Sequence, residues 1–129
     1  MSQVVFQSVS PIGDTDVKAL PVLALGPAIA YYTQILGFSL VVKTSSSAVL
    51  TRDNAEIVLE VNKKDPEQAS CYFGVSDVDA LHAEYTAKGI EPSPLRVDEY
   101  GGKRFRVFFA KEPYGVCFCF GQPVPDPEK

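Results

Sequence analysis

Few residues in this sequence carry side chains suited to catalysis or to metal binding. His82 is the one histidine, and Cys71, Cys117 and Cys119 are the three cysteines. A histidine beside a cysteine or a serine would suggest nucleophilic catalysis, because the imidazole activates the nucleophile by taking its proton. His82 follows Leu81 in a segment with helical spacing, away from the segments that carry the cysteines. The sequence therefore predicts a partly exposed helix residue and no Ser-His-Asp or Cys-His site.

The cysteines allow two interpretations. Cys117 and Cys119 occupy alternate positions of one apolar segment, so they share a face of a predicted strand. Thiolates bind zinc well, but two thiols without a histidine are a weak donor set, and packed cysteines are the favoured interpretation. The odd number of cysteines, all within predicted strands, favours reduced thiols and a cytoplasmic location over a disulfide framework.

The remaining composition argues against several classes of partner. The chain has 129 residues, enough for a real core, and we expect a single domain over residues 1–129. Its net charge of −4 is scattered, which argues against nucleic-acid and membrane partners. No apolar run is long enough to span a membrane, and the N-terminus lacks a signal-peptide pattern. Gly101-Gly102 lies in a hairpin-like loop rather than before a helix, so it predicts no phosphate-binding loop.

The elements that must position these residues are clearest between Gly102 and Pro123. Two apolar runs, 105–110 and 116–120, flank Glu112-Pro113-Tyr114-Gly115, whose proline and glycine predict a turn. The runs are too short for helices and rich in Phe and Val, so they predict two antiparallel strands. Both runs are apolar on both faces. One face must cover a core, and the other needs a helix, a partner chain or a ligand.

The rest of the chain predicts a duplicated plan of strand, helix, glycine and three strands, which is an α+β fold. Helices are expected near 27–36 and 77–88, and each is followed by a glycine, Gly37 or Gly89, suited to end it. The further strands are expected at 17–25, 38–43, 48–51, 57–61, 70–75 and 90–97. The apolar patch Val4–Phe6 predicts an N-terminal arm or an edge strand, which completes this sheet or a partner's.

Three parts of the sequence resemble the vicinal oxygen chelate superfamily, which includes glyoxalase I, ring-cleaving dioxygenases, fosfomycin resistance proteins and bleomycin resistance proteins. LPVLALGPAIAYYTQILGF at 20–38 resembles the opening strand and helix of the family, and VSDVDALHAEYTAKG at 75–89 is similar to the corresponding part of its second module. FFAKEPYG at 108–115 stands where the family has an Asp-Pro-x-Gly-Asn turn, and FGQP at 120–123 matches its usual exit. The resemblance implies two βαβββ modules, at about 16–62 and 69–123, that form a curved, cup-shaped mixed sheet with the helices on the convex side.

Members of this superfamily usually hold a divalent metal with His and Glu side chains on the concave face of the cup. The resemblance places the four ligand positions at Val17, Glu60, Ser70 and Cys119, and only Glu60 keeps the family's residue type. A metal-dependent lyase, isomerase or oxygenase built on Glu60 and Cys119 stays an alternative. The lost ligands favour a protein that needs no metal or other cofactor and is more nearly a binder than an enzyme.

Strand parity predicts what the cup presents to a ligand. The expected concave residues are Val58, Glu60, Ser70, Tyr72, Phe105, Val107, Phe109, Cys117 and Cys119, with Tyr100 and Arg104 at the rim. Such an apolar, aromatic surface suits a small aromatic or amphiphilic molecule, and the resemblance to metal-free bleomycin resistance proteins implies sequestration of such a molecule. The alternative is a cup filled by its own side chains or by a partner chain. A homodimer is expected, because relatives commonly pair modules from two chains and an unpaired N-terminal edge strand needs a cover.

Overall fold

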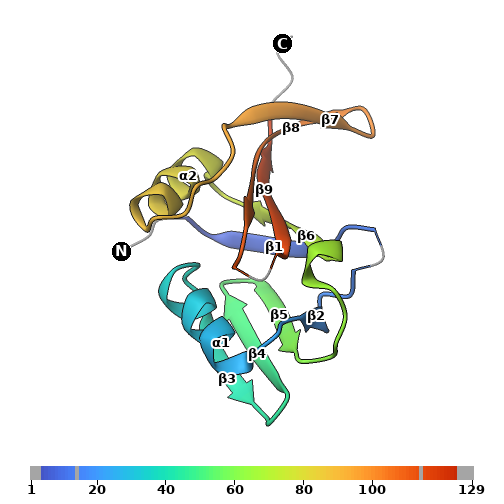
Figure 1. Cartoon of the computed structure of the whole chain (residues 1–129). Helices are drawn as coiled ribbons and strands as arrows, with labels where there is room; N and C mark the ends of the chain where they lie inside the picture. Colours follow the sequence, from blue (N-terminus) through green and yellow to red (C-terminus); the bar gives the residue numbers. More distant parts are fainter. Residues whose placement is uncertain (1–3, 14, 114, 125–129) are drawn as a thin grey trace.

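The computed structural model describes residues 4–13, 15–113 and 115–124, which form two modules of similar plan (Figure 1). Module one, in the lower half of the view, contains β2 (Leu20–Pro21), α1 (Leu25–Gln34), β3 (Ser39–Lys43), β4 (Ser47–Arg52) and β5 (Ala55–Glu60). Module two contains β6 (Ser70–Val75), α2 (Val78–Ala87), β7 (Arg96–Tyr100), β8 (Lys103–Lys111) and β9 (Cys117–Pro123). A 3₁₀ turn, Pro66–Gln68, lies between the modules in sequence, and β1 (Phe6–Pro11) precedes both.

The strands of each module form their own mixed sheet. The order is β2-β5-β4-β3 in module one and β1-β6-β9-β8-β7 in module two. In each module the strand before the helix pairs in parallel with the last strand, and the other pairs are antiparallel. This repeated βαβββ plan confirms the predicted α+β fold. No helix in the described part of the chain is long and apolar enough to cross a membrane.

The N-terminal strand β1 is an edge strand of its own chain's second sheet. It runs antiparallel to β6, with Phe6 opposite Val75 and Ser10 opposite Tyr72. The Phe6 amide donates to Asp53 Oδ2 at 2.8 Å, and the Asn54 amide donates to the Phe6 carbonyl oxygen at 2.9 Å. The sequence left open whether this arm completes its own sheet or a partner's, and in the structure it completes its own.

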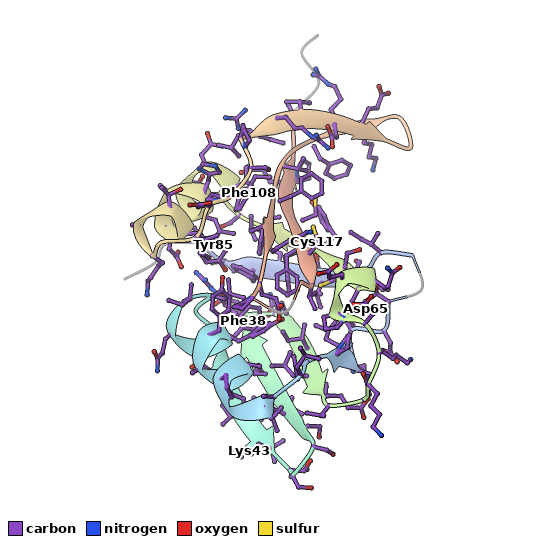
Figure 2. All side chains as sticks on the ribbon, in the orientation of Figure 1. Phe38, Lys43, Asp65, Tyr85, Phe108 and Cys117 are labelled. Atoms are coloured by element: carbon purple, nitrogen blue, oxygen red, sulfur yellow. The ribbon has the colours of Figure 1, made fainter. Side chains whose placement is uncertain are left out.

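Alternation along β8 and β9 separates a core face from an outer face. Phe108, Phe118 and Phe120 are fully or almost fully buried, and α2 packs against this face of the second sheet. Figure 2 shows Phe108 and Tyr85 between α2 and the sheet. The Phe108 and Phe120 rings stack with their centroids 5.0 Å apart. Burying one such side chain stabilises the fold by about 1.5–3 kcal/mol, so this face forms the main core.

Arg52 joins the modules at their buried contact. Its Nη1 atom donates to the Leu36 carbonyl oxygen at 2.7 Å, and its two terminal nitrogens lie 3.1 and 3.2 Å from the carboxylate oxygens of Glu84 on α2. The guanidinium carbon lies 4.4 Å from the centre of the Phe6 ring. One side chain of β4 therefore contacts the segment that follows α1, helix α2 and strand β1.

The predicted turns and helix ends are present where the glycines occur. Gly101 and Gly102 both have positive φ, 60° and 81°, and connect β7 to β8 in a two-residue hairpin. Gly37 and Gly89, with φ of 84° and 91°, follow α1 and α2. The strand expected at 90–97 begins only at Arg96, because the prolines before it cannot donate to a ladder.

Candidate functional site

A cavity of about 590 Å³ opens on the face of the second sheet that lies opposite α2. We call this cavity the cup. Its lining consists of Ser10, Pro11, Ile12, Tyr72, Phe105, Phe109 and Cys119. Four of these residues, namely Tyr72, Phe105, Phe109 and Cys119, were predicted from strand parity. The cup is thus an apolar, mostly aromatic surface supplied by β1, β6, β8 and β9.

The wall that β1 contributes was missed by sequence reasoning. Ser10, Pro11 and Ile12 reach the cup because β1 pairs with β6, which lies about half the length of the chain away in sequence. No local feature of the sequence predicts this pairing. The one available signal was the apolar patch around Phe6, which predicted an edge strand without saying which strand it joins.

The floor of the cup is formed where the Tyr72 ring of β6 lies against Gly121 of β9. The Tyr72 ring meets the Phe105 ring edge-on, with centroids 6.3 Å apart and planes at 78°. It also lies over Gly121 of β9, where an added Cβ atom would be 2.9 Å from the Tyr72 hydroxyl oxygen and 2.7 Å from Val107 Cγ1. Val107 is fully buried and is part of the support beneath the cup rather than of its lining.

A charged pair on β7 borders the cup. Arg96 lies over the Phe109 ring, with the guanidinium carbon 5.0 Å from the ring centre, and pairs with Asp98 at 3.0 Å. A cation over an aromatic face is favourable by about 0.5–1 kcal/mol at an exposed position. Sequence reasoning missed this pair: Arg96 lay within the strand expected at 90–97 but was not assigned to the cup, and Asp98 lay beyond the end of that strand. Continued alternation through Tyr100 was the signal that would have placed Arg96 and Asp98 on the cup face.

The thiol of Cys119 is a packing group at neutral pH. Burial raises the pKa of Cys119 to about 12, helped by Cys117 and Asp98 and opposed by the positive charge of Arg96. The thiolate is the nucleophilic form and the metal ligand, so a raised pKa makes the thiol a poor nucleophile and a poor ligand. Cys119 therefore contributes a small apolar surface to the cup.

Several predicted site residues lie elsewhere. Glu60 is in the four-stranded sheet, where its Oε1 atom accepts from Asn62 Nδ2 at 3.1 Å. Ser70 begins β6 outside the cup lining, and its amide donates to Thr15 Oγ1 at 2.9 Å. Arg104 is on the opposite face of β8 from Phe105. Cys117 lies beside a neighbouring pocket, and Val58 is on the outer face of β5 with Glu60.

Two residues named in the sequence analysis are not fully described by the structure. Tyr100 ends β7, but its side chain is not among those described, and neither is Tyr114 of the predicted turn. His82 is described, and its Nε2 atom lies 2.9 Å from the Ser93 carbonyl oxygen while its ring meets Phe108 edge-on. It therefore has a structural role on α2.

The four positions at which the superfamily holds its metal do not form a donor set in this chain. Val17 has no donor atom, Glu60 and Cys119 lie in different sheets, and the Cys119 thiol is protonated at neutral pH. Among the described residues, no three His, Cys, Asp or Glu side chains come together in a way that could hold a metal ion. These residues do not fit the divalent metal of the superfamily.

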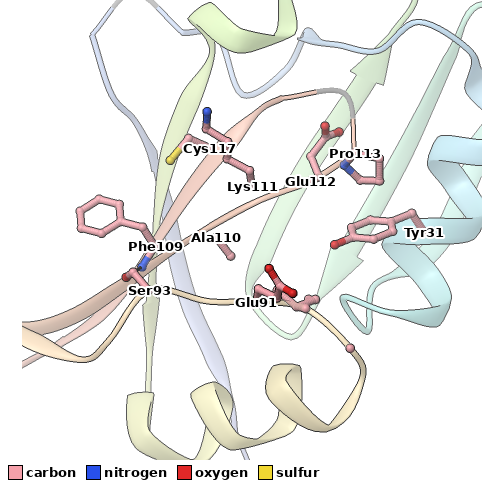
Figure 3. Close-up of a pocket in the computed structure, with 11 residues that line it drawn as sticks. Tyr31, Glu91, Ser93, Phe109, Ala110, Lys111, Glu112, Pro113 and Cys117 are labelled. Carbon is pink, nitrogen blue, oxygen red and sulfur yellow. Dashed lines mark hydrogen bonds between the residues drawn. The ribbon is translucent and has the colours of Figure 1, made fainter.

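A second pocket, of about 580 Å³, lies between α1 and the end of the β8–β9 hairpin (Figure 3). Figure 3 shows the Tyr31 hydroxyl and the Glu91 carboxylate directed into the space between these elements. Glu112 is buried, and its Oε2 atom accepts from the Tyr32 hydroxyl at 3.0 Å. Burial and the negative charge of Glu112 raise the pKa of Tyr31. Phe109 borders both this pocket and the cup.

Several solved structures share this fold. A bleomycin-binding protein from Streptomyces verticillus, complexed with copper(II)-bleomycin, is 21% identical, with 84% of this chain and 95% of that chain covered and a TM-score of 0.68. A bleomycin resistance determinant encoded on the transposon Tn5 is 17% identical, with 85% and 98% covered and a TM-score of 0.70. TnmS3, an antibiotic-binding protein from Streptomyces sp. CB03234, is 18% identical, with 88% and 99% covered and a TM-score of 0.68. At these identities the similarity concerns the fold.

The sequence itself matches a family model. No curated protein matches the chain. Residues 16–120 match the model of the glyoxalase/bleomycin resistance protein/dioxygenase superfamily, and this range includes both helices and all strands except β1 and the end of β9. Because this match spans most of the chain and the two-module fold agrees with it, the chain belongs to the glyoxalase/bleomycin resistance protein/dioxygenase superfamily.

Proposed function

We propose that this protein binds a small aromatic or amphiphilic molecule in the cup, without a metal, and so sequesters it. The observation that carries this proposal is the lining itself, in which Tyr72, Phe105 and Phe109 surround an open cavity of about 590 Å³. A cavity of this size and composition is typical of small-molecule sites, because flat apolar molecules gain from burial and ring stacking. Arg96 and Asp98 provide charges at the edge, which suits a molecule with one polar end.

The chemistry of the cup favours binding over catalysis. Cys119 holds its proton at neutral pH, so the cup lining presents no activated nucleophile among the described residues. The three structural neighbours named above are described as binding or conferring resistance to antibiotics. Their fold supports the same class of function here.

We also propose a homodimer in which each chain covers the cup of the other. Val42 pairs with Val49, and Val49 pairs with Val58, so these three valines share one face of the sheet of module one. This apolar face is uncovered. Val42 is 54% exposed, and Glu60 lies on the same face. A second copy that placed this face against the cup would bury both apolar surfaces and add Glu60 to the cup.

The reducing cytoplasm is the proposed location. Cys71, Cys117 and Cys119 are all free thiols in the structure, and unpaired buried cysteines are typical of proteins that fold where glutathione keeps thiols reduced.

Ligand binding is best tested on protein treated with EDTA and then dialysed. Thermal shift with a panel of planar aromatic compounds, followed by calorimetry, should find compounds that bind without metal, since a ligand of the native state raises the melting temperature. Phe105→Ala should weaken their affinity by about tenfold, because it removes one stacking wall. The matched control is Leu23→Ala, since Leu23 is 64% exposed and lies in module one, before α1.

Two results would overturn the proposal. One is a stoichiometric metal in protein purified without chelator, together with loss of that metal in Glu60→Ala. The other is equal affinity of the Phe105→Ala and Leu23→Ala variants for every compound that binds the wild type.

A further inference from the structure

The position of the Tyr72 ring depends on a residue of the neighbouring strand. Tyr72 and Gly74 follow each other on one face of β6, and Gly74 pairs with Gly121 of β9. The ring extends over β9, so that a Cβ atom on Gly121 would lie 2.9 Å from the Tyr72 hydroxyl oxygen and 3.0 Å from its Cε1 atom. A distance below 3.0 Å is essentially never found for a real Cβ atom, so the ring hydroxyl occupies space that only glycine leaves.

Neighbours from β8 flank the ring on one side, and the cup is open beside it. Val107 Cγ1 would be 2.7 Å from the same Cβ atom, and Val107 is fully buried, so it cannot withdraw without disturbing the support of the cup. The Phe105 ring contacts Tyr72 edge-on from β8. The open space next to the ring is the cup, where Cys119 lies directly opposite Tyr72 on β9.

We infer that Gly121 keeps the cup open, because it gives the Tyr72 ring a place over β9 and a side chain at position 121 would turn the ring into the cup above Cys119. Gly121 is therefore a positioning residue for the cup. Its consequence for ligands rests on the proposed function, since an occupied cup needs the ring on β9. The geometry assigns Tyr72 two states, over Gly121 with the cup open and over Cys119 with the cup filled.

Gly74 provides the matched control because it lies directly opposite Gly121 but differs in its neighbours. A Cβ atom on Gly74 would be 3.7 Å from Tyr72 Cε2, an ordinary contact, and 2.7 Å from Ser8 Oγ. The Ser8 hydroxyl ends a short rotatable side chain and can move away. Gly74→Ala therefore adds the same methyl group to the same pair of strands without displacing the ring.

The test measures access to the Cys119 thiol and needs no ligand. In a Cys117→Ser background, Cys119 is the cysteine that borders the cup, and Cys71 is fully buried. Alkylation by iodoacetamide at pH 9, followed by peptide mass spectrometry, gives the rate at Cys119. Cys119 is itself 4% exposed, so the rate in the Cys117→Ser background is the reference. Gly121→Ala should slow alkylation several-fold below that reference, Gly74→Ala should leave the rate close to it, and Gly121→Ala with Tyr72→Ala should restore it.

Either of two rates would overturn the inference: an unchanged rate in Gly121→Ala, or a slow rate that persists when the Tyr72 ring is also removed. If Gly121→Ala does not fold, the wild type still decides. A nuclear Overhauser effect between the Tyr72 ring protons and the Gly121 α-protons is expected in the free protein, and its absence would contradict the placement of the ring.

The link to ligand binding is tested separately with 1-anilinonaphthalene-8-sulfonate as the probe. If the probe binds the wild type in the cup, its affinity should fall several-fold in Gly121→Ala and recover in the double variant. If no aromatic compound binds the wild type, the proposed function fails, while the alkylation rates still decide whether Gly121 keeps the cup open.

Discussion

Phe108 and Phe109 are consecutive residues of β8 in opposite surroundings. Phe108 is fully buried between the sheet and α2, whereas Phe109 is partly exposed and borders the cup. Truncation of a core phenylalanine leaves a cavity and costs about 3–5 kcal/mol. We expect Phe108→Ala to lose stability in this range and Phe109→Ala to lose clearly less, as measured by urea unfolding.

The comparison has its own internal check. The slope of the unfolding free energy with urea should be similar in the two variants, since neither alters the surface exposed on unfolding by much. A larger loss for Phe109→Ala would mean that the cup is packed as a second core, which would remove the main support for ligand binding.

The buried thiol of Cys71 makes stability depend on pH in the alkaline range. Burial raises the pKa of Cys71 from its ordinary value of 9.0 to about 12, with smaller contributions from Cys117 and Cys119. The folded protein therefore keeps this proton at pH values where the unfolded chain has lost it. Its stabilising effect is complete below pH 9 and is lost as the pH rises through 12.

We expect the unfolding free energy to fall by about 1 kcal/mol between pH 8 and 10 on account of this one group. Urea unfolding at both pH values measures it. Cys71→Ala should be less stable at pH 8 but should show a smaller fall toward pH 10. An equal fall in both proteins would assign the pH dependence to other groups.

At the residue scale, strand parity predicted four of the seven residues that line the cup. Tyr72, Phe105, Phe109 and Cys119 could be predicted because alternation fixes which side chains of a strand share a face. Arg96 was not assigned to the cup although it lay within the strand expected at 90–97, because the two prolines in that range interrupt the alternation. Glu60 was placed in the cup because the resemblance assumed one continuous concave face, whereas the strands divide into two sheets.

The connection from α1 to β3 depends on Gly37. Its φ of +84° lies in the left-handed region, and an added Cβ atom would be 2.6 Å from Arg52 Nη1. Gly37→Ala should therefore lose stability by about 1 kcal/mol from the backbone conformation. Further loss should follow because Arg52 must leave the Leu36 carbonyl oxygen and the Glu84 carboxylate.

Gly26 of α1 is the control for Gly37, which follows that helix. It lies in α1 without a positive φ, and nothing lies within 4 Å of an added Cβ atom. Gly26→Ala should leave stability unchanged or raise it by up to about 1 kcal/mol. Thermal unfolding of the two variants measures the contrast, and equal melting temperatures would show that Gly37 is not a constrained position.

Helices were predicted well from the sequence, because the residue pattern that marks a helix is local. Both helices lie within two residues of the expected ranges, because apolar spacing and a terminal glycine mark them. The pairing of β1 with β6 could not be predicted, since Val4–Phe6 would fit any open sheet edge of this chain or of another. The Asp53 side chain that holds the Phe6 amide is visible only in three dimensions.

For the whole molecule, the two uncovered faces predict self-association. Sedimentation at micromolar concentration should give the mass of a dimer, and Val42→Asp should shift it toward the monomer because a charge would be placed on the apolar face. Val97→Asp is the control, since Val97 is 47% exposed but lies on the face of β7 opposite the cup. A wild type that sediments as a monomer would contradict the homodimer.

The pairing of β1 with β6 has a consequence for biosynthesis. The ribosome makes β1 before the strands it joins, yet its partner strand lies about half the chain later, and that partner in turn pairs with β9. Phe6, the aromatic residue at the centre of the module contact, therefore remains exposed to solvent while the rest of the chain is translated. We expect nascent chains that end before β6 to be the most dependent on chaperones, because contacts so distant in sequence form late and leave an apolar edge open to other chains.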